Sequence, residues 1–269
     1  MNAIDALFQR LRETKKRAFM PFLTAGDPDA ATTARLIQTV VSAGANLVEV
    51  GFPFSDPIAD GPVIQASYTR ALDKGLKIEE VFASIRSVTS SPGWTTPIVG
   101  MVSYSLIFRR GVEVFLDQAI AAGLSGAIVP DLPAEESEEL AKKCKERDFK
   151  LILLVTPTTS PERSVKIVQL CTGFLYCVSV VGITGERDRL PVVLREQLQN
   201  LRKLTPLPLC VGFGVSKPEH IHDLREVADG VIVGSALVRR LEQVATKGID
   251  AVVDDIHTQV SELVKALNG

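Results

Sequence analysis

A carboxylate stands inside an apolar strand pattern, directly before a proline-rich loop that holds two more. Glu49 lies between Val48 and Val50, and Asp56 and Asp60 follow on the loop. A strand turns successive side chains to opposite faces, so Glu49 points away from both valines. If that face lines a closed pocket, burial favours the protonated carboxyl and suits Glu49 for proton transfer near neutral pH. The alternative is a Glu paired with a Lys or Arg of a neighbouring strand.

The composition is ordinary for a folded protein and offers no surface for nucleic acid. The 269 residues are 46% hydrophobic and 23% charged, with a formal net charge of -2. No stretch joins clustered Lys and Arg to aromatic residues, which argues against nucleic acid as a partner. The first residues contain no apolar leader, and no apolar run reaches the length of a membrane span. We therefore expect a soluble, unexported protein with no membrane partner.

The cysteines and histidines form no metal-binding pattern. The four cysteines, Cys144, Cys171, Cys177 and Cys210, show no CxxC spacing, and the three histidines have no Cys or carboxylate at ligand spacing. Reduced cysteines in apolar segments behave as small hydrophobic residues. We expect no metal site and a cytoplasmic location, with the plastid stroma as the alternative.

Short apolar, β-branched runs alternate with longer amphipathic runs along the chain, a pattern typical of βα units over a parallel sheet. The eight expected strands are 19–25, 47–51, 97–102, 126–131, 151–157, 174–180, 207–214 and 230–235. Helix starts are marked at Asp29, at Pro133 with Glu135, at Ser160 and at Ser216. Gly44, Gly123 and Gly230 stand just before strands, where a helix can end through a left-handed residue.

The regular spacing predicts one domain over residues 1–269, a (β/α)8 TIM barrel with an added N-terminal helix over about residues 3–14. The rival is an open doubly wound sheet. That fold more often has a GxGxxG turn after its first strand, whereas this chain has Phe22–Pro28 there. A nicotinamide or flavin cofactor is therefore disfavoured.

Glycines cluster after the sixth, seventh and eighth expected strands. The clusters are Gly182-Ile183-Thr184-Gly185, Gly212-Phe213-Gly214 and Gly234-Ser235. Glycine lets backbone N–H groups approach an anion closely, and Ser235 would open a short helix whose first amides carry partial positive charge. Tight turns also need glycine, but three such turns at neighbouring strand ends predict a phosphate site.

These residues identify a family: the chain resembles the tryptophan synthase α subunit over essentially its whole length. The matching segments are 22–28, 49–61, 130–133 with Glu135 and Glu136, 182–185, 212–214 and 234–236. The resemblance implies a lyase that splits indole-3-glycerol phosphate into indole and glyceraldehyde 3-phosphate. It also implies an α2β2 complex in which the β subunit carries pyridoxal phosphate and the α chain has no cofactor.

The resemblance also implies roles for single residues. Glu49 matches the catalytic acid and base, and Asp60 matches the carboxylate that accepts the indole N–H. The other matches are substrate-binding positions: Phe22, Tyr176, Thr184, Gly185, Phe213, Gly214, Gly234 and Ser235. Phe22 would form one wall of the indole site, and Thr184 would contact Asp60 from a closing loop.

The chain departs from the family pattern after the third expected strand. Ser103 stands where an aromatic residue is expected, and Ser105-Leu106 replaces an Asn-Pro pair. Tyr104 could compensate only if the strand shifted, since adjacent residues face opposite sides. The loop 52–58 is the best candidate for contact with a β subunit. Two alternatives stay open beside the main interpretation, a stand-alone indole-releasing lyase and a noncatalytic regulatory partner of a β subunit.

Overall fold

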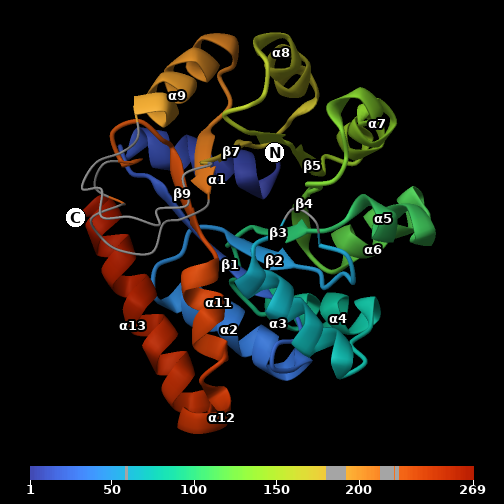
Figure 1. Cartoon of the computed structure of the whole chain (residues 1–269), viewed down its shortest axis with the longest axis vertical. Helices are drawn as coiled ribbons and strands as arrows, with labels where there is room; N and C mark the ends of the chain where they lie inside the picture. The colour runs from blue at the N-terminus through green and yellow to red at the C-terminus, as the bar shows by residue number, and fades with distance from the viewer. Residues whose placement is uncertain (58–59, 180–191, 213–220, 222–223) are drawn as a thin grey trace.

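A barrel of parallel strands surrounded by helices forms the centre of the molecule (Figure 1). The computed structural model describes all residues except 58–59, 180–191, 213–220 and 222–223. The strands are β1 (Ala18–Thr24), β2 (Val48–Gly51), β3 (Ile98–Met101), β4 (Leu124–Ile128), β5 (Lys150–Ile152), β6 (Leu154–Val155), β7 (Leu175–Val178), β8 (Leu209–Gly212) and β9 (Gly230–Val233). Their order is β5-β4-β3-β2-β1-β9-β8-β7-β6.

The two outermost strands in this order, β5 and β6, are separated by Leu153 alone, so the sheet curls almost fully onto itself. Between the two strands, the N–H of Leu153 donates to the Cys171 Sγ at 3.4 Å. All eight expected strands are present, the fifth being divided in two. The predicted (β/α)8 barrel is confirmed, and the single-domain assignment over residues 1–269 stays a prediction.

The helices follow the strands in the expected alternation. They are α1 (Ala3–Glu13), α2 (Ala30–Ser42), α3 (Pro62–Asp73), α4 (Ile78–Thr89), α5 (Tyr104–Arg110), α6 (Val112–Ala121), α7 (Glu138–Glu146), α8 (Pro161–Leu170), α9 (Val192–Leu204), α11 (Ser235–Leu241), α12 (Val244–Lys247) and α13 (Ile249–Asn268). A short 3-10 helix, η1 (Ala134–Glu136), precedes α7.

Helix starts were largely predictable from capping chemistry. The Asp29 side chain accepts the N–H of Thr32, and the Ser160 side chain accepts that of Arg163, as expected of N-caps. At Pro133 the expectation was partly wrong, because the first turn is the separate η1 and α7 begins only at Glu138. Ser216 lies outside the described residues.

Two of the three glycines predicted at helix ends have the expected left-handed backbone. Gly44 has φ 106° and Gly123 has φ 86°. The prediction was wrong for Gly230, which is the first residue of β9 and has no positive φ. A side chain at Gly230 would meet the Cys210 Sγ at 2.8 Å and Met20 Sδ at 3.1 Å, so close packing inside the barrel is the physical reason for glycine there.

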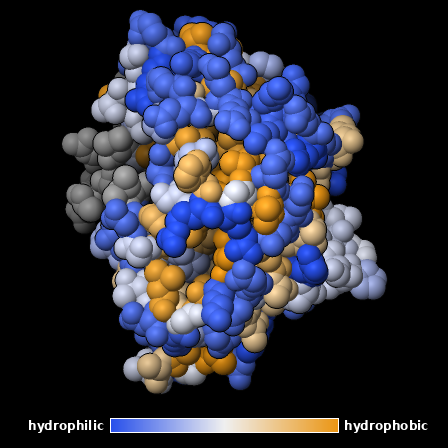
Figure 2. Space-filling view, turned by 90° about the vertical axis from the view of Figure 1, so that its right-hand side faces the viewer, coloured by the Kyte–Doolittle hydropathy of each residue, from blue (hydrophilic) through white to orange (hydrophobic). Residues whose placement is uncertain are grey.

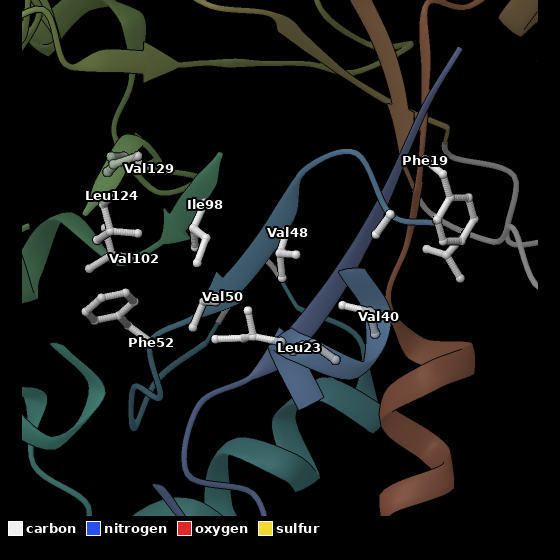
Figure 3. Close-up of a cluster of buried hydrophobic side chains, with 14 of the residues drawn as sticks. Phe19, Leu23, Val40, Val48, Val50, Phe52, Ile98, Val102, Leu124 and Val129 are labelled. Carbon is white, nitrogen blue, oxygen red and sulfur yellow. The ribbon is translucent and has the colours of Figure 1, made fainter. Parts of the chain in front are cut away.

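Strand alternation divides the apolar residues into two cores. Residues such as Leu23, Val48 and Val50 face the surrounding helices and form the outer core (Figure 3). Phe52 belongs to this core and lies 5.4 Å from Phe82 between ring centroids, so it is packing rather than exposed interface. The inner core fills the barrel and includes Met20 and Leu47.

The added N-terminal helix, predicted over residues 3–14, is confirmed as α1 and closes one end of the barrel. Its apolar residues Ile4, Leu7, Phe8 and Leu11 are buried in the inner core. The Phe8 ring lies 6.0 Å from that of Phe174. The Asn2 side chain donates hydrogen bonds to the carbonyls of Ser125 and Asp148, which fixes the start of the helix to this end of the barrel.

In the described part of the chain, no helix is long and apolar enough to cross a membrane. The face in Figure 2 is mixed, with hydrophobic residues gathered toward its centre among hydrophilic ones. The four cysteines are buried and free. The described residues hold no group of three or more His, Cys, Asp or Glu that could bind a metal ion.

Candidate active site

Glu49 points into the barrel. It lies opposite Phe22 of β1 and Val99 of β3 in the parallel register, and Val99 and Phe22 both belong to the inner core. The Glu49 side chain is fully buried, with 0% exposure, and neither carboxylate oxygen has a hydrogen-bond partner among the described residues. The alternative of an ion pair with a neighbouring strand therefore finds no support in that part of the chain.

The surroundings of Glu49 favour its protonated form. Burial raises the pKa of its carboxyl well above the ordinary value, because a carboxylate without donors loses its hydration inside the barrel. A group that is protonated near neutral pH can act first as an acid. Buried polar groups are nearly always paired, so this unpaired carboxyl calls for a functional explanation.

Asp60 sits at the end of the loop that joins β2 to α3. Its N–H donates to the Pro57 carbonyl at 3.1 Å, and its own carbonyl accepts the Gln65 side chain at 2.8 Å. Its carboxyl lies in a pocket that is also lined by Met101 and Ser103. Burial raises the Asp60 pKa from 3.8 to about 6, so this carboxylate is still ionised at neutral pH.

Two tyrosines, Tyr68 and Tyr176, lie close enough to both carboxylates for the charges of Glu49 and Asp60 to raise their pKa. Burial raises the pKa of Tyr68 well above its usual value, and the charges of Asp60 and Glu49 raise it further. For Tyr176 the causes are again burial, followed by the charges of Glu49 and Asp60. Tyr68 was missed in the sequence analysis, although its spacing from Ile64 and Ala71 on α3 is that of a buried helix face.

Helix α3, which carries Tyr68, is fixed to the end of β1 by a buried ion pair. Asp27 has 2% exposure and accepts hydrogen bonds from Arg70 Nη2 at 2.6 Å and Nε at 3.2 Å. The Ser67 hydroxyl donates to the same carboxylate. Bidentate Arg–carboxylate pairs fix geometry as well as adding stability. The position of α3 relative to the barrel is therefore well defined.

Glycines at the strand ends let aromatic side chains lie across the barrel mouth. A Cβ atom at Gly51 would lie 2.6 Å from Tyr68 Oη and would also overlap the end of the Phe22 ring. A Cβ at Gly212 would lie 2.6 Å from Tyr176 Cε1. Phe22 and Tyr176, two predicted site residues, are thus brought to the same end of the barrel as Glu49.

The predicted phosphate residues are described only in part. Gly234 precedes α11 and its carbonyl begins the helix by accepting the N–H groups of Leu237 and Val238. Ser235 is the first helical residue, as expected, and an ideal Cβ at Gly234 would lie 3.4 Å from Phe22 Cβ. Four other predicted positions, Thr184, Gly185, Phe213 and Gly214, lie outside the described residues.

Ser103 lies in the Asp60 pocket and caps α5. Its hydroxyl donates to Asp131 Oδ2 at 2.6 Å, while the Tyr104 N–H donates to Asp131 Oδ1 at 2.8 Å. The Tyr104 ring packs against Phe108, with 6.1 Å between centroids. Tyr104 is the first residue of α5 and its ring lies against Phe108, so it does not take the place of the aromatic residue expected at 103.

Comparison with known proteins identifies the family of the chain. Residues 8–268 match the family described as "Tryptophan synthase alpha chain". The tryptophan synthase alpha chain of Rhodopirellula baltica is 51% identical over 263 residues, which cover 97% of this chain and 95% of that one. That of Synechocystis is 49% identical over 93% of this chain and 95% of its own.

Solved structures agree with the sequence relatives. Tryptophan synthase subunit alpha of Legionella pneumophila superposes with a TM-score of 0.90 at 34% identity, covering 99% of this chain and 98% of that one. A chain from the tryptophan synthase a2b2 complex of Pyrococcus furiosus gives a TM-score of 0.85 at 39% identity, covering 93% and 99%. The chain therefore belongs to the tryptophan synthase alpha chain family.

Proposed function

We propose that Glu49 transfers the protons and ionised Asp60 stabilises the developing charge in the lyase reaction of this family, the cleavage of indole-3-glycerol phosphate into indole and glyceraldehyde 3-phosphate. The observation that carries the proposal is a fully buried, unpaired Glu49 on β2, followed by a loop whose Asp60 lines a pocket. The two carboxyls have different environments, and two-carboxylate enzymes divide acid and base roles in this way.

The proposed order of events follows from the two pKa directions. Glu49 rests protonated and donates its proton to C3 of the indole, which makes the ring a good leaving group. The resulting Glu49 carboxylate then takes the proton of the glycerol hydroxyl as the C3–C3′ bond breaks and the aldehyde forms. Glu49 is thereby returned to its starting state.

Asp60 serves the other side of the ring. Positive charge builds on the indole nitrogen when C3 is protonated, and an ionised carboxylate that accepts the N1–H stabilises it. With a pKa of about 6, Asp60 is ionised at neutral pH and can do this without gaining or losing a proton. Its place at the end of a loop lets small loop movements align it with the substrate.

The remaining site residues are proposed as substrate contacts. Phe22 and Tyr176 would form apolar walls for the indole ring, since flat aromatic surfaces suit such a ligand. Gly234 and Ser235 would offer backbone N–H groups to the phosphate, together with Thr184, Gly185, Phe213 and Gly214. These assignments rest on the resemblance and on the position of Phe22 beside Gly234.

The partner and the cellular location belong to the same proposal. A solved relative is an a2b2 complex, and we expect this chain to bind a tryptophan synthase β subunit that carries pyridoxal phosphate, with no cofactor of its own. We expect a cytoplasmic location. Mixing the chain with a β subunit and following indole release tests the coupling; an unchanged rate at saturating partner would contradict it.

Substitution of Glu49 tests the proposal most sharply. Glu49→Gln keeps the shape but cannot transfer a proton, and we expect lyase turnover to fall by about 10²–10⁴-fold. Binding of glyceraldehyde 3-phosphate, measured by calorimetry, should stay near that of the wild type. Glu146→Gln, an exposed site on α7, is the matched control and should be fully active. Retained turnover in Glu49→Gln would refute the assignment.

A further inference from the structure

Tyr68 is a buried phenol that the reaction described above does not use. It has 3% exposure on α3, and the sequence contains only two other tyrosines, Tyr104 and Tyr176. It belongs to the inner core although it comes from a helix of the outer ring. Its side chain therefore reaches from α3 over the end of β2 into the barrel mouth.

The hydroxyl of Tyr68 lies at the reaction site. It would be 2.6 Å from a Cβ atom at Gly51, two residues after Glu49 on the same strand and the same face. Tyr68 also lines the pocket that contains Asp60. The phenol thus stands between the strand of one carboxylate and the loop of the other.

The Asp60 carboxylate accepts no hydrogen bond in the described part of the chain, so a donor for it must come from the pocket when the substrate is bound. Among the described residues, none is seen to donate to its carboxylate. The described pocket lining holds two hydroxyls, those of Tyr68 and Ser103, and Ser103 already donates to Asp131 at 2.6 Å. An ionised, partly buried carboxylate gains most from a donor held in place.

The frame around Tyr68 is rigid enough for that task. The ion pair of Asp27 with Arg70, and the hydrogen bond from Ser67, fix α3 on either side of Tyr68 in sequence. Burial and the charges of Asp60 and Glu49 raise the pKa of Tyr68, so its hydroxyl stays protonated and can only donate to a carboxylate beside it.

We propose that Tyr68 is a positioning residue of the lyase reaction, whose phenol hydroxyl donates a hydrogen bond to ionised Asp60 and directs that carboxylate toward the indole N–H. The inference rests on the proposed role of Asp60. Ser103 lines the same pocket but has no ring. Tyr68 is therefore the aromatic residue with a hydroxyl in the described lining of this pocket.

The test is Tyr68→Phe, which keeps the ring and removes only the hydroxyl, with Tyr104→Phe as the matched control on the outer side of the barrel. We expect kcat for indole release to fall about tenfold or more in Tyr68→Phe, with KM changed by less than about threefold. The acid limb of the pH–kcat profile should move to higher pH, because the ionised Asp60 loses a donor.

The result that overturns the inference is a Tyr68→Phe enzyme whose kcat and acid limb both match Tyr104→Phe. A fall in kcat with an unmoved acid limb would also overturn it, since loss of packing alone would do that. A wild-type enzyme without an acid limb near pH 6 would instead refute the proposed role of Asp60, so the two failures are distinguishable.

Discussion

At the end of the barrel closed by α1, a charge that enters the barrel is fully paired, whereas at the opposite end a carboxyl has no partner among the described residues. Lys150, at the start of β5, has 15% side-chain exposure and binds Asp5 at 2.6 Å and Asp148 at 3.3 Å. Glu49 is deeper and unpaired. In barrel enzymes the first end serves stability and the second carries the chemistry.

The pKa directions express the same difference. Burial acts to lower the pKa of Lys150, but hydrogen bonds and charges from Asp5 and Asp148 outweigh it, so the ammonium is favoured. Burial alone acts on Glu49, and the charged form is disfavoured. The partly buried, paired Lys150 is therefore a stable ion, whereas the fully buried, unpaired Glu49 holds a transferable proton.

The largest effect of the three changes that follow is expected from Gly51→Ala, and it should appear in the lyase rate. The added methyl group would overlap Phe22 and Tyr68 at the barrel mouth. We therefore expect kcat/KM to fall by about 10–100-fold and the free energy of unfolding to fall by about 1–3 kcal/mol. Gly100→Ala is the control, because its methyl group would meet Phe52 of the outer core at 3.0 Å. Equal lyase rates in the two variants would contradict the comparison.

A smaller effect should appear in the pH profile. Asp60 must be ionised, and burial raises its pKa to about 6, so kcat/KM should fall about tenfold per pH unit below that value. Indole release measured from pH 4.5 to pH 8 tests this. A kcat/KM that stays constant down to about pH 4.5 would contradict this, because it would place the pKa of Asp60 near the ordinary value of 3.8 in the active enzyme.

The smallest effect should come from Lys150→Met at the closed end. The change removes the ion pairs but leaves Asp5, which has 40% exposure, in contact with water. We expect a loss of about 1 kcal/mol in unfolding free energy and an unchanged lyase rate. A large loss of activity without unfolding would mean that the closed end also contributes to the chemistry.

The repeated βα pattern predicted the barrel, and strand alternation placed Glu49 on the face opposite Val48 and Val50. The expected strand 47–51 turns Val48 and Val50 to the outer core and Leu47 to the inner core, as observed. The division of the fifth strand at Leu153, whose N–H donates to the Cys171 Sγ 18 residues away, leaves no mark in the local sequence pattern.

Site residues on a strand or at a helix start were predictable from the sequence. The site residue on a helix that packs over the barrel mouth was not. Glu49 and Ser235 were placed by local pattern, whereas Tyr68 reaches the site from α3, a helix that pairs with Asp27 after β1. Helical spacing could mark Tyr68 as buried, but not which part of the barrel it enters. At Gly230 the local pattern was misleading. It indicated a helix end, whereas the close packing of Cys210 and Met20 explains the glycine.

The most direct test of the central claim is the pH dependence of unfolding in the wild type and in Glu49→Gln. The folded-state pKa of Glu49 is raised above the ordinary 4.5, so its protonation stabilises the fold at low pH and that stability is lost as pH rises through the folded value. Between pH 4.5 and the raised folded-state pKa, the unfolding free energy of the wild type should fall by about 1.4 kcal/mol per pH unit relative to that of Glu49→Gln.

Urea unfolding of both proteins from pH 5 to pH 8 measures this difference. Asp60 is present in both and cancels to first order. The account predicts that the unfolding free energy of Glu49→Gln rises steadily relative to that of the wild type from pH 5 upward, until Glu49 ionises in the folded protein. A constant difference from pH 5 to pH 7 would mean that Glu49 is already charged in the folded protein, which would contradict the account.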